Sequence, residues 1–161
     1  MTRGAGAIEV RRADGDQGVA DARVLLRQYA SRVGRDLSLR EFARELAELP
    51  GEYAGPRGEL LLATCGGRLA GCVALRPLGD GACEMRRLFV RHQFRDKGVG
   101  KRLALAVIEA AREAGYGAVR LTLSPWMEEA TAIYRTLGFR EIEAYQRGHV
   151  KGVVFMELSL H

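Results

Sequence analysis

Hydrophobic residues recur every three or four positions in some segments of the chain and every second position in others, which predicts alternating helices and strands. The clearest helical pattern covers residues 99–114. Its apolar face holds Val99, Leu103, Ala106, Val107, Ala110, Ala111 and Ala114. Strand-like patterns precede it at residues 84–90 and follow it at 119–123, and Gly115 is a typical helix C-cap. We therefore predict a strand–helix–strand crossover between parallel strands.

The same criteria predict a series of elements around this unit. Ser38 and Glu41 form a capping box that opens a second helix, and Gly66-Gly67 is typical of a tight hairpin turn. The apolar face of that second helix is predicted to hold Leu39, Phe42, Ala43 and Leu46. The predicted order is strand 8–12, helix 19–33, helix 39–49, loop 51–58, strands 60–64 and 69–75, a third strand that ends at 90, helix 99–114, strand 119–123, a helix from Ser124-Pro125 to Gly138, and strand 153–158.

The strand before the crossover helix has an irregular pattern. Cys83 and Met85 place apolar side chains at odd positions, whereas Leu88 and Val90 place them at even positions. The alternation changes phase near Arg86-Arg87, which is what a β-bulge produces. A strand buried on both faces near its end would give the same pattern.

Length and composition favour one globular unit. The 161 residues, 47% of them hydrophobic, are enough for one core, so we expect a single domain over residues 1–161. We find no run of about 18 apolar residues and no apolar signal-peptide core, so we expect a soluble, cytoplasmic protein without a membrane partner. Cys65, Cys72 and Cys83 lack metal-site spacing, and we expect reduced core cysteines, no disulfide framework and no metal.

The charge distribution argues against a nucleic-acid partner. The net charge is +5, but the 25 basic residues are dispersed among 20 acidic ones. The three lysines are Lys97, Lys101 and Lys151, and the other basic residues are arginines, which a GC-rich genome of bacterial type would produce. The positive balance favours an anionic cofactor.

A glycine-rich turn opens the crossover helix. Gly98 and Gly100 allow the backbone to curl with its N–H groups pointing inward, and the helix dipole adds about half a positive charge there. This arrangement suits a pyrophosphate. Solvated basic residues at an ordinary helix entry are the alternative.

The spacing separates this turn from two common nucleotide-binding loops. A Walker loop requires Gly where Arg95 stands and Ser or Thr where Arg102 stands. The dinucleotide fingerprint requires a third Gly where Leu103 stands. The remaining pattern is Arg-x-x-Gly-x-Gly, so a different pyrophosphate ligand is expected.

Three motifs in this order resemble the GCN5-related N-acetyltransferases, which transfer an acyl group from acyl-CoA to an amine. They are Glu84-Met-Arg-Arg-Leu-Phe-Val90, Arg95-x-x-Gly98-x-Gly100 and Tyr134-Arg-x-Leu-Gly-Phe139. The resemblance implies an α/β fold with a central twisted mixed sheet, mostly antiparallel and splayed at the cofactor site, and helices on both faces. It implies acetyl-CoA, or another acyl-CoA, as the cofactor. The residues implied in cofactor binding are Leu88, Phe89 and Val90 for the pantetheine arm and Arg95, Asp96, Lys97, Gly98, Val99, Gly100 and Lys101 for the pyrophosphate.

The resemblance also assigns catalytic roles. Tyr134 matches the tyrosine that donates a proton to the departing CoA thiolate, although without the resemblance it is an ordinary core tyrosine. Glu84 is the candidate base, acting through water; the alternative is an exposed glutamate paired with Arg86 or Arg120. His92 is the rival base, but it lies at the strand exit, where a surface histidine is expected. The N–H groups of the bulge would stabilise the oxyanion.

The acceptor pocket of this fold is walled by the first two helices, the loop after them and the last hairpin. The candidate substrate-binding residues are Tyr29, Glu52, Tyr53, Tyr145, Arg147 and His149. Glu52-Tyr53 would bind a cationic amine and Arg147 a carboxylate, which together suit an amino acid or peptide N-terminus, while ordinary loop polarity is the alternative. Met127 stands where many family members carry Asn, so one cofactor hydrogen bond is expected to be absent or replaced.

Two further interpretations concern function and assembly. A non-catalytic acyl-CoA sensor would keep the glycine-rich turn but would not need Glu84 or Tyr134. The presence of both residues favours an enzyme that acetylates a primary amine of a small molecule, amino acid or peptide by direct attack. An edge strand of the sheet is available for homodimer formation.

Overall fold

Seven strands form one sheet in the computed structural model, which describes residues 6–33, 38–125, 128–147 and 151–161. The order along the chain is β1 (Ile8–Arg12), α1 (Gly15–Val33), α2 (Leu39–Glu48), η2 (Gly51–Tyr53), β2 (Glu59–Cys65), β3 (Arg68–Gly79), β4 (Ala82–Val90), η3 (His92–Phe94), α3 (Val99–Glu113), β5 (Ala118–Leu123), α4 (Glu128–Thr136), β6 (Arg140–Ile142) and β7 (Val154–Ser159). The order across the sheet is β1-β2-β3-β4-β5-β7-β6. The β4–β5 pair is parallel and the other pairs are antiparallel, so the mixed, mostly antiparallel sheet and the crossover through α3 are confirmed.

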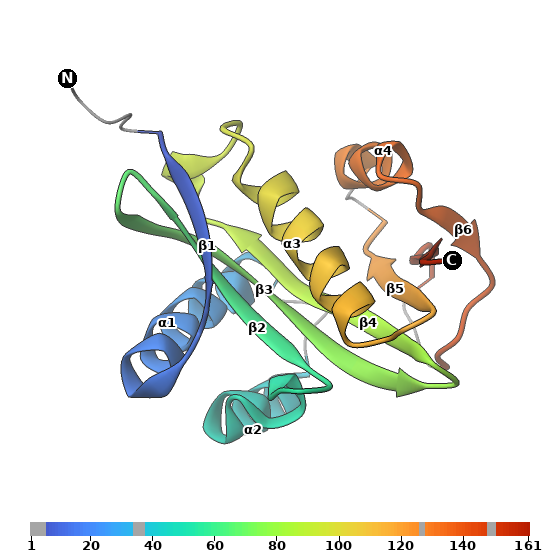
Figure 1. Ribbon diagram of the computed structural model, residues 1–161, viewed down its shortest axis with the longest axis horizontal. Coiled ribbons are helices and arrows are strands. Elements are labelled where there is room, and N and C mark those ends of the chain that lie inside the picture. The colour runs from blue at the N-terminus through green and yellow to red at the C-terminus, as the bar shows by residue number, and fades with distance from the viewer. Residues whose placement is uncertain (1–5, 34–37, 126–127, 148–150) are drawn as a thin grey trace.

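Helices cover both faces of the sheet, with α3 and α4 on one face and α1 and α2 on the other (Figure 1). Alternate strand residues point to opposite faces, which divides the core in two. Val73 and Leu121 pack with Leu103 of α3 on one face. Leu62 packs with Leu25 of α1 on the other face. The α3 pattern in the sequence therefore reflects direct packing on the sheet.

The second helix buries less than its sequence pattern predicts. Phe42 is buried and Leu46 is partly buried, but Leu39 is 74% exposed and Ala43 is exposed, so the prediction for these two residues is wrong. The reason is that α2 is short and contacts the sheet along a narrow stripe. The predicted cap is confirmed, because Ser38 Oγ accepts a hydrogen bond from the Glu41 N–H at 3.4 Å.

The last helix begins later than its sequence pattern predicts. Helix α4 starts at Glu128, and the predicted opening pair Ser124-Pro125 precedes it without being helical. Met127 lies outside the described residues. Gly138 has a φ of +101° and follows the end of the helix, as predicted.

The predicted bulge in β4 is confirmed. Cys72 pairs with Phe89 and Ala74 pairs with Arg86, so Arg87 and Leu88 together oppose a single residue of β3. Arg87 has a φ of +61°, a conformation that favours glycine. The bulge bends the strand and re-aims its last residues.

Strands β4 and β5 separate soon after they start. Their parallel pairing covers Ala82 to Glu84 on β4 and Ala118 to Arg120 on β5. From Met85 onward β4 has no partner on that side among the residues that the structure describes, while β5 pairs with β7 over its full length. The sheet is therefore splayed toward the start of α3, as the resemblance implies.

The three cysteines are free and buried, which confirms the prediction of reduced core cysteines. Burial raises the pKa of Cys72 and of Cys83 to about 12, so both stay as inert thiols. Among the described residues, no three potential metal ligands come together. No helix in the part of the chain that the structure describes is long and apolar enough to cross a lipid bilayer.

Candidate active site

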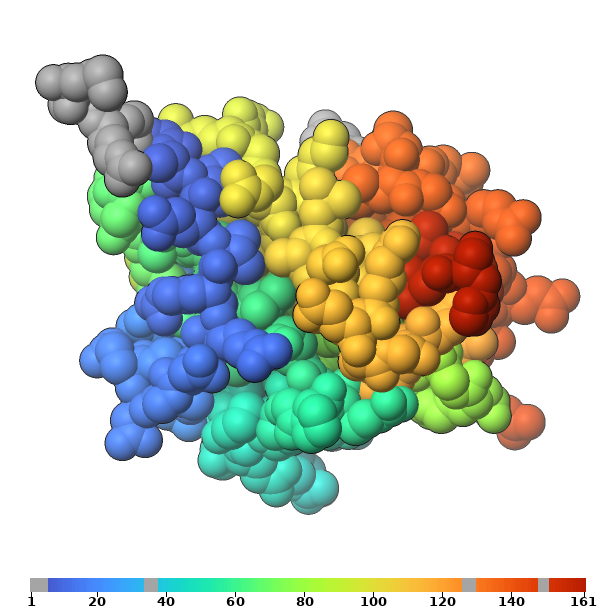
Figure 2. Space-filling view, in the orientation of Figure 1, coloured from blue at the N-terminus to red at the C-terminus, as the bar shows by residue number. Residues whose placement is uncertain are grey.

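The turn before α3 has the backbone geometry that an anion cradle requires. Gly98 is the N-cap residue of α3 with a φ of +87°, and Asp96 has a φ of +63°. A Cβ added at Gly98 would have no neighbour within 4 Å, so the space beside the turn is open. Lys97 and Lys101 are exposed on either side of it. Figure 2 shows the first turn of α3 at the molecular surface.

Gly100 is a second feature of this turn that suits a phosphate group. Its φ is not in the left-handed region, and a Cβ there would meet only Val90 Cγ2, at an ordinary 3.6 Å. Neither conformation nor packing therefore requires glycine, although glycine costs about 1 kcal/mol relative to alanine inside a helix. A glycine here leaves the backbone open to close approach by a ligand. The turn thus fits the pyrophosphate of a CoA molecule.

The residues around the turn are placed by β4. Arg95 Nε donates a hydrogen bond to the carbonyl oxygen of Val90 at 3.2 Å, which ties the loop to the strand end. Leu88 and Val90 pack partly buried against the α3 side of the core. Phe89 points to the opposite face, where its ring meets the Tyr29 ring edge-on at 6.4 Å. The Phe89 ring therefore lies away from α3, and only the backbone of this residue is available to a ligand on the α3 side.

Glu84 lies on the α1/α2 face where β4 and β5 begin to separate, and it is only 2% exposed. Arg76 donates to Oε1 from Nε at 2.9 Å and from Nη2 at 2.8 Å. Tyr145 Oη donates to Oε2 at 2.7 Å, and Gln146 Nε2 donates to the same oxygen at 3.1 Å. Both carboxylate oxygens therefore have strong partners.

The expected alternative for Glu84, an exposed glutamate, is wrong. The predicted contact with Arg86 is present, from Nε to Oε1 at 3.4 Å, but Arg120 is not a partner. Arg120 instead donates to Glu157 at 2.8 Å, because these residues face each other across β5 and β7. Arg76 takes its place, since it is the direct cross-strand neighbour of Glu84. Extending β3 through Arg76 to the turn before β4 would have placed Arg76 opposite Glu84.

Tyr134 approaches β4 from the other face of the sheet. It is buried, and its ring packs edge-on against Phe139 with 5.4 Å between centroids. Its hydroxyl contacts Met85 Sδ at 3.9 Å. Burial, with a smaller contribution from the nearby Tyr29 hydroxyl, raises the pKa of Tyr134 well above its ordinary value. The hydroxyl therefore keeps its proton at neutral pH.

A cavity of about 380 Å³, here called the acceptor cavity, lies between α2 and the strands. Tyr53 reaches into it and donates to Glu45 Oε2 at 2.8 Å. Glu52 is at its mouth, 62% exposed, and forms an ion pair with Arg76 at 3.0 Å. The charge of Glu52 is thus already balanced by a neighbour within the protein.

The other predicted acceptor residues that the structure describes do not line this cavity. Tyr145 covers Glu84, and Tyr29 lies at the opposite end beside Arg87, whose guanidinium carbon is 5.4 Å from the Tyr29 ring centroid. Arg147 is exposed and does not line the cavity. His149 lies outside the described residues. Of the predicted acceptor residues that the structure describes, Glu52 and Tyr53 therefore line the cavity, whereas Tyr29, Tyr145 and Arg147 do not.

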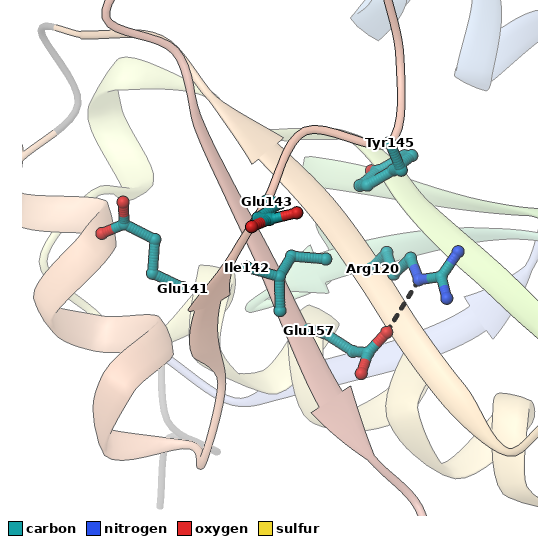
Figure 3. A pocket seen from close by; sticks show the side chains of 6 residues that line it. All are labelled: Arg120, Glu141, Ile142, Glu143, Tyr145 and Glu157. Carbon is teal, nitrogen blue, oxygen red and sulfur yellow. Dashed lines mark hydrogen bonds and ion pairs between the residues drawn. The ribbon is translucent and has the colours of Figure 1, made fainter.

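Tyr145 borders a different, open groove, which is also lined by Arg120, Glu141, Ile142, Glu143 and Glu157 (Figure 3). The Arg120 guanidinium lies 5.5 Å from the centroid of the Tyr145 ring and pairs with Glu157. The ring stacks edge-on against Phe155. Burial, reinforced by the charge of Glu84, raises the pKa of Tyr145. Tyr145 therefore serves as a neutral hydrogen-bond donor between the groove and Glu84.

Sequence reasoning missed the charged residues that hold α2 against the bulge. Arg87 forms a bidentate ion pair with Glu45, from Nε to Oε2 at 3.0 Å and from Nη2 to Oε1 at 2.8 Å. The aromatic rings of Tyr29 and Phe42 flank the same guanidinium. No local pattern pairs these residues, because 42 positions separate them in the chain. The positive φ of Arg87 turns its side chain toward α2.

We expect Glu45→Gln to destabilise the protein by about 3 kcal/mol at pH 7, because it leaves the buried Arg87 charge without a partner. Burial alone would raise the pKa of Glu45, but Arg87, the Tyr53 hydroxyl and Arg86 together lower it below 4.5. The stabilisation is therefore complete above that ordinary value and is lost as the pH falls toward the lowered one. Urea unfolding of both proteins at pH 7 and pH 4 measures the difference.

The matched control for this prediction is Glu48→Gln. Glu48 is exposed on the same helix, and a neutral substitution there should change the free energy of unfolding by less than about 0.5 kcal/mol. Equal effects of the two substitutions at pH 7 would contradict a specific role for the Arg87–Glu45 pair.

Comparison with known proteins agrees with this fold and site. The sequence pattern of the Acetyltransferase (GNAT) family matches residues 24–139. An uncharacterized N-acetyltransferase of Schizosaccharomyces pombe is 32% identical over 146 residues, which cover 89% of this chain and 90% of the relative. Two solved structures share the fold. An acetyltransferase of the GNAT family from Staphylococcus aureus has a TM-score of 0.78 at 19% identity, covering 96% of this chain and 100% of its own. The PaiA N-acetyltransferase of Thermoplasma acidophilum, solved in complex with coenzyme A, has a TM-score of 0.72 at 17% identity, covering 95% and 99%.

A splayed mixed sheet with a glycine-rich turn at the splay and an N-acetyltransferase sequence pattern defines an acyl-CoA-dependent N-acyltransferase. The chain belongs to the GNAT family of acetyltransferases. Acetyl-CoA fits as its cofactor, since the turn before α3 offers the open backbone that a pyrophosphate needs.

Proposed function

We propose that this enzyme transfers the acetyl group of acetyl-CoA directly to a primary amine of a small molecule, amino acid or peptide. One observation carries the proposal: Glu84 and Tyr134 reach the splay of the sheet from opposite faces of β4. Tyr134 contacts Met85, the residue next to Glu84, and successive strand residues point to opposite faces. A reaction at the splay would therefore have a proton acceptor on one side and a proton donor on the other.

The reaction has simple requirements. When bound, acetyl-CoA supplies a thioester, and transfer forms a C–N bond, breaks the C–S bond, removes one proton from the amine and delivers one to sulfur. The turn from Arg95 to Lys101 would hold the pyrophosphate, and the free edge of Leu88 to Val90 would hold the pantetheine arm. The N–H groups of the bulge would stabilise the developing oxyanion.

Glu84 and Tyr134 would handle the two protons. Glu84, held in place by Arg76 and Arg86, would accept the amine proton through a water molecule. Tyr134 would donate its proton to the sulfur, and its raised pKa means that it is protonated when the reaction begins. Because the Glu84 oxygens already have close partners, its contact with the amine is indirect.

The first test is a thermal shift with acetyl-CoA, CoA, ATP and NAD in parallel. At about 100 times its dissociation constant, a ligand stabilises by about 2.7 kcal/mol. We expect stabilisation by acetyl-CoA and CoA alone, followed by release of free thiol when an amine panel is added with acetyl-CoA. Preference for ATP or NAD would refute the cofactor assignment, and CoA binding without thiol release from any amine would refute the acceptor class.

A further inference from the structure

The acceptor cavity is bordered by more enclosed positive charge than negative charge. Three guanidinium groups of neighbouring strands line it, those of Arg76, Arg86 and Arg87. Two enclosed carboxylates pair with them: Glu45, which lines the cavity, and Glu84, which does not. The other charged side chains of the lining, Glu41, Arg44, Glu48 and Glu52, are exposed, so solvent screens their charges. Glu52 also pairs with Arg76 at 3.0 Å. One of the three enclosed guanidinium groups is therefore left without an enclosed carboxylate of its own.

The surplus of enclosed positive charge is located at Arg86. Arg76 and Arg87 each make two contacts of 3.0 Å or less to one enclosed carboxylate, Glu84 and Glu45 respectively, and Arg76 also contacts the exposed Glu52 at 3.0 Å. Arg86 contacts the same two carboxylates at longer distances, 3.4 Å to Glu84 Oε1 and 3.8 Å to Glu45 Oε1. Both distances exceed those of a strong charge-assisted hydrogen bond, about 2.7–2.9 Å. Among the described residues, the Arg86 guanidinium therefore has no short contact to a carboxylate.

The position of Arg86 connects this guanidinium to the reaction. Arg86 lies two residues after Glu84 on the same strand and directly before the bulge at Arg87. It lines the acceptor cavity and donates to the Tyr53 hydroxyl at 3.3 Å. An anionic group bound to Arg86 would thus lie beside the point where β4 and β5 separate. An amine a few bonds away on the same molecule would reach the splay.

We propose that Arg86 binds a carboxylate of the acceptor, so that the substrate is a free amino acid whose amine and carboxylate lie close together. The inference rests on the proposed function. A planar carboxylate matches the fork of the guanidinium and would supply the missing negative charge. The cavity, at about 380 Å³, has the size of a small-ligand site. A peptide is disfavoured, because its carboxylate is far from its terminal amine.

The test compares acceptors that differ only in this carboxylate. The twenty L-amino acids are assayed by thiol release beside their α-carboxamides and beside dipeptides with the same N-terminal residue. For the amino acids that are turned over, we expect kcat/KM to exceed that of the carboxamide about 10- to 100-fold, the effect of one hydrogen-bonded charge. Equal kcat/KM for the two would overturn carboxylate recognition while leaving the acetyltransferase function intact. Turnover of dipeptides or simple amines alone would do the same.

Variants test whether the Arg86 side chain causes the preference for an acceptor with a carboxylate. Arg86→Gln should reduce the ratio of kcat/KM between amino acid and carboxamide to near one, and Arg86→Lys should restore part of it. Arg120→Gln is the matched control, because Arg120 lies on the same face of the neighbouring strand with a similar side-chain exposure of 26% against 24%. We expect it to keep the wild-type ratio. An unchanged ratio in Arg86→Gln, or an equal loss in Arg120→Gln, would overturn the role of Arg86. Because a ratio is compared within each variant, general loss of stability does not mimic the effect.

Discussion

Gly98→Arg is expected to abolish acetyl-CoA binding, weakening it by at least about 100-fold and removing the roughly 2.7 kcal/mol of ligand stabilisation that the wild type shows. The arginine side chain would occupy the open space beside the turn, where a Cβ now meets nothing within 4 Å. It would also force a residue with a Cβ into a φ near +87°, which costs about 1–2 kcal/mol and misaligns the N–H groups. Because the added charge is positive, electrostatic repulsion of a phosphate would not explain a loss.

Gly115 offers a matched control for this substitution. It also has a φ of +87° and open space at the Cβ position, but it ends α3 and so lies at the opposite end of the helix from the turn. Gly115→Arg should lower the melting temperature by a similar amount and leave acetyl-CoA affinity unchanged. Unchanged affinity in Gly98→Arg, measured by calorimetry, would refute the assignment of the turn as the pyrophosphate site.

Tyr134→Phe is expected to lower kcat by about 100-fold or more while leaving CoA affinity unchanged, as removal of a general acid does. The substitution deletes one oxygen whose contact in the protein is a long one to Met85 Sδ, so little packing is lost. Burial raises the pKa of Tyr134, so the wild type should show no loss of its acid as the pH rises to about 9. Steady-state kinetics with an identified amine, and calorimetry with CoA, measure the two quantities.

Tyr116 provides the corresponding control. It is equally buried, and its hydroxyl donates to the carbonyl oxygen of Arg57 at 2.6 Å, away from the splay. Tyr116→Phe should destabilise the protein by about 1 kcal/mol and leave kcat unchanged. Wild-type turnover in Tyr134→Phe would remove its acid role, and an equal loss in Tyr116→Phe would point to general destabilisation.

Local patterns in the chain predicted most of the elements. The hydrophobic period of residues 99–114 matches α3 almost to its ends, and the phase change at Arg86-Arg87 marked the bulge. The predicted face of α3 omitted Ala104 and Ile108, which are buried because the sheet covers a wider arc of the helix than one stripe. The same method failed for Leu39, because a helix that contacts the sheet at few points leaves its apolar residues in water.

The sequence by itself determined the elements, their order and the glycine-rich turn, because these depend on interactions between residues close in the chain. Only the tertiary structure decided the surroundings of the candidate acid and base. Glu84 meets Tyr145 61 positions later, and Arg87 meets Glu45 42 positions earlier. Such ion pairs and hydrogen bonds depend on strand register and on which side chains are shielded from water, and neither is encoded in a local pattern. The enclosed surplus of positive charge at Arg86 likewise arises only when three segments converge on one cavity.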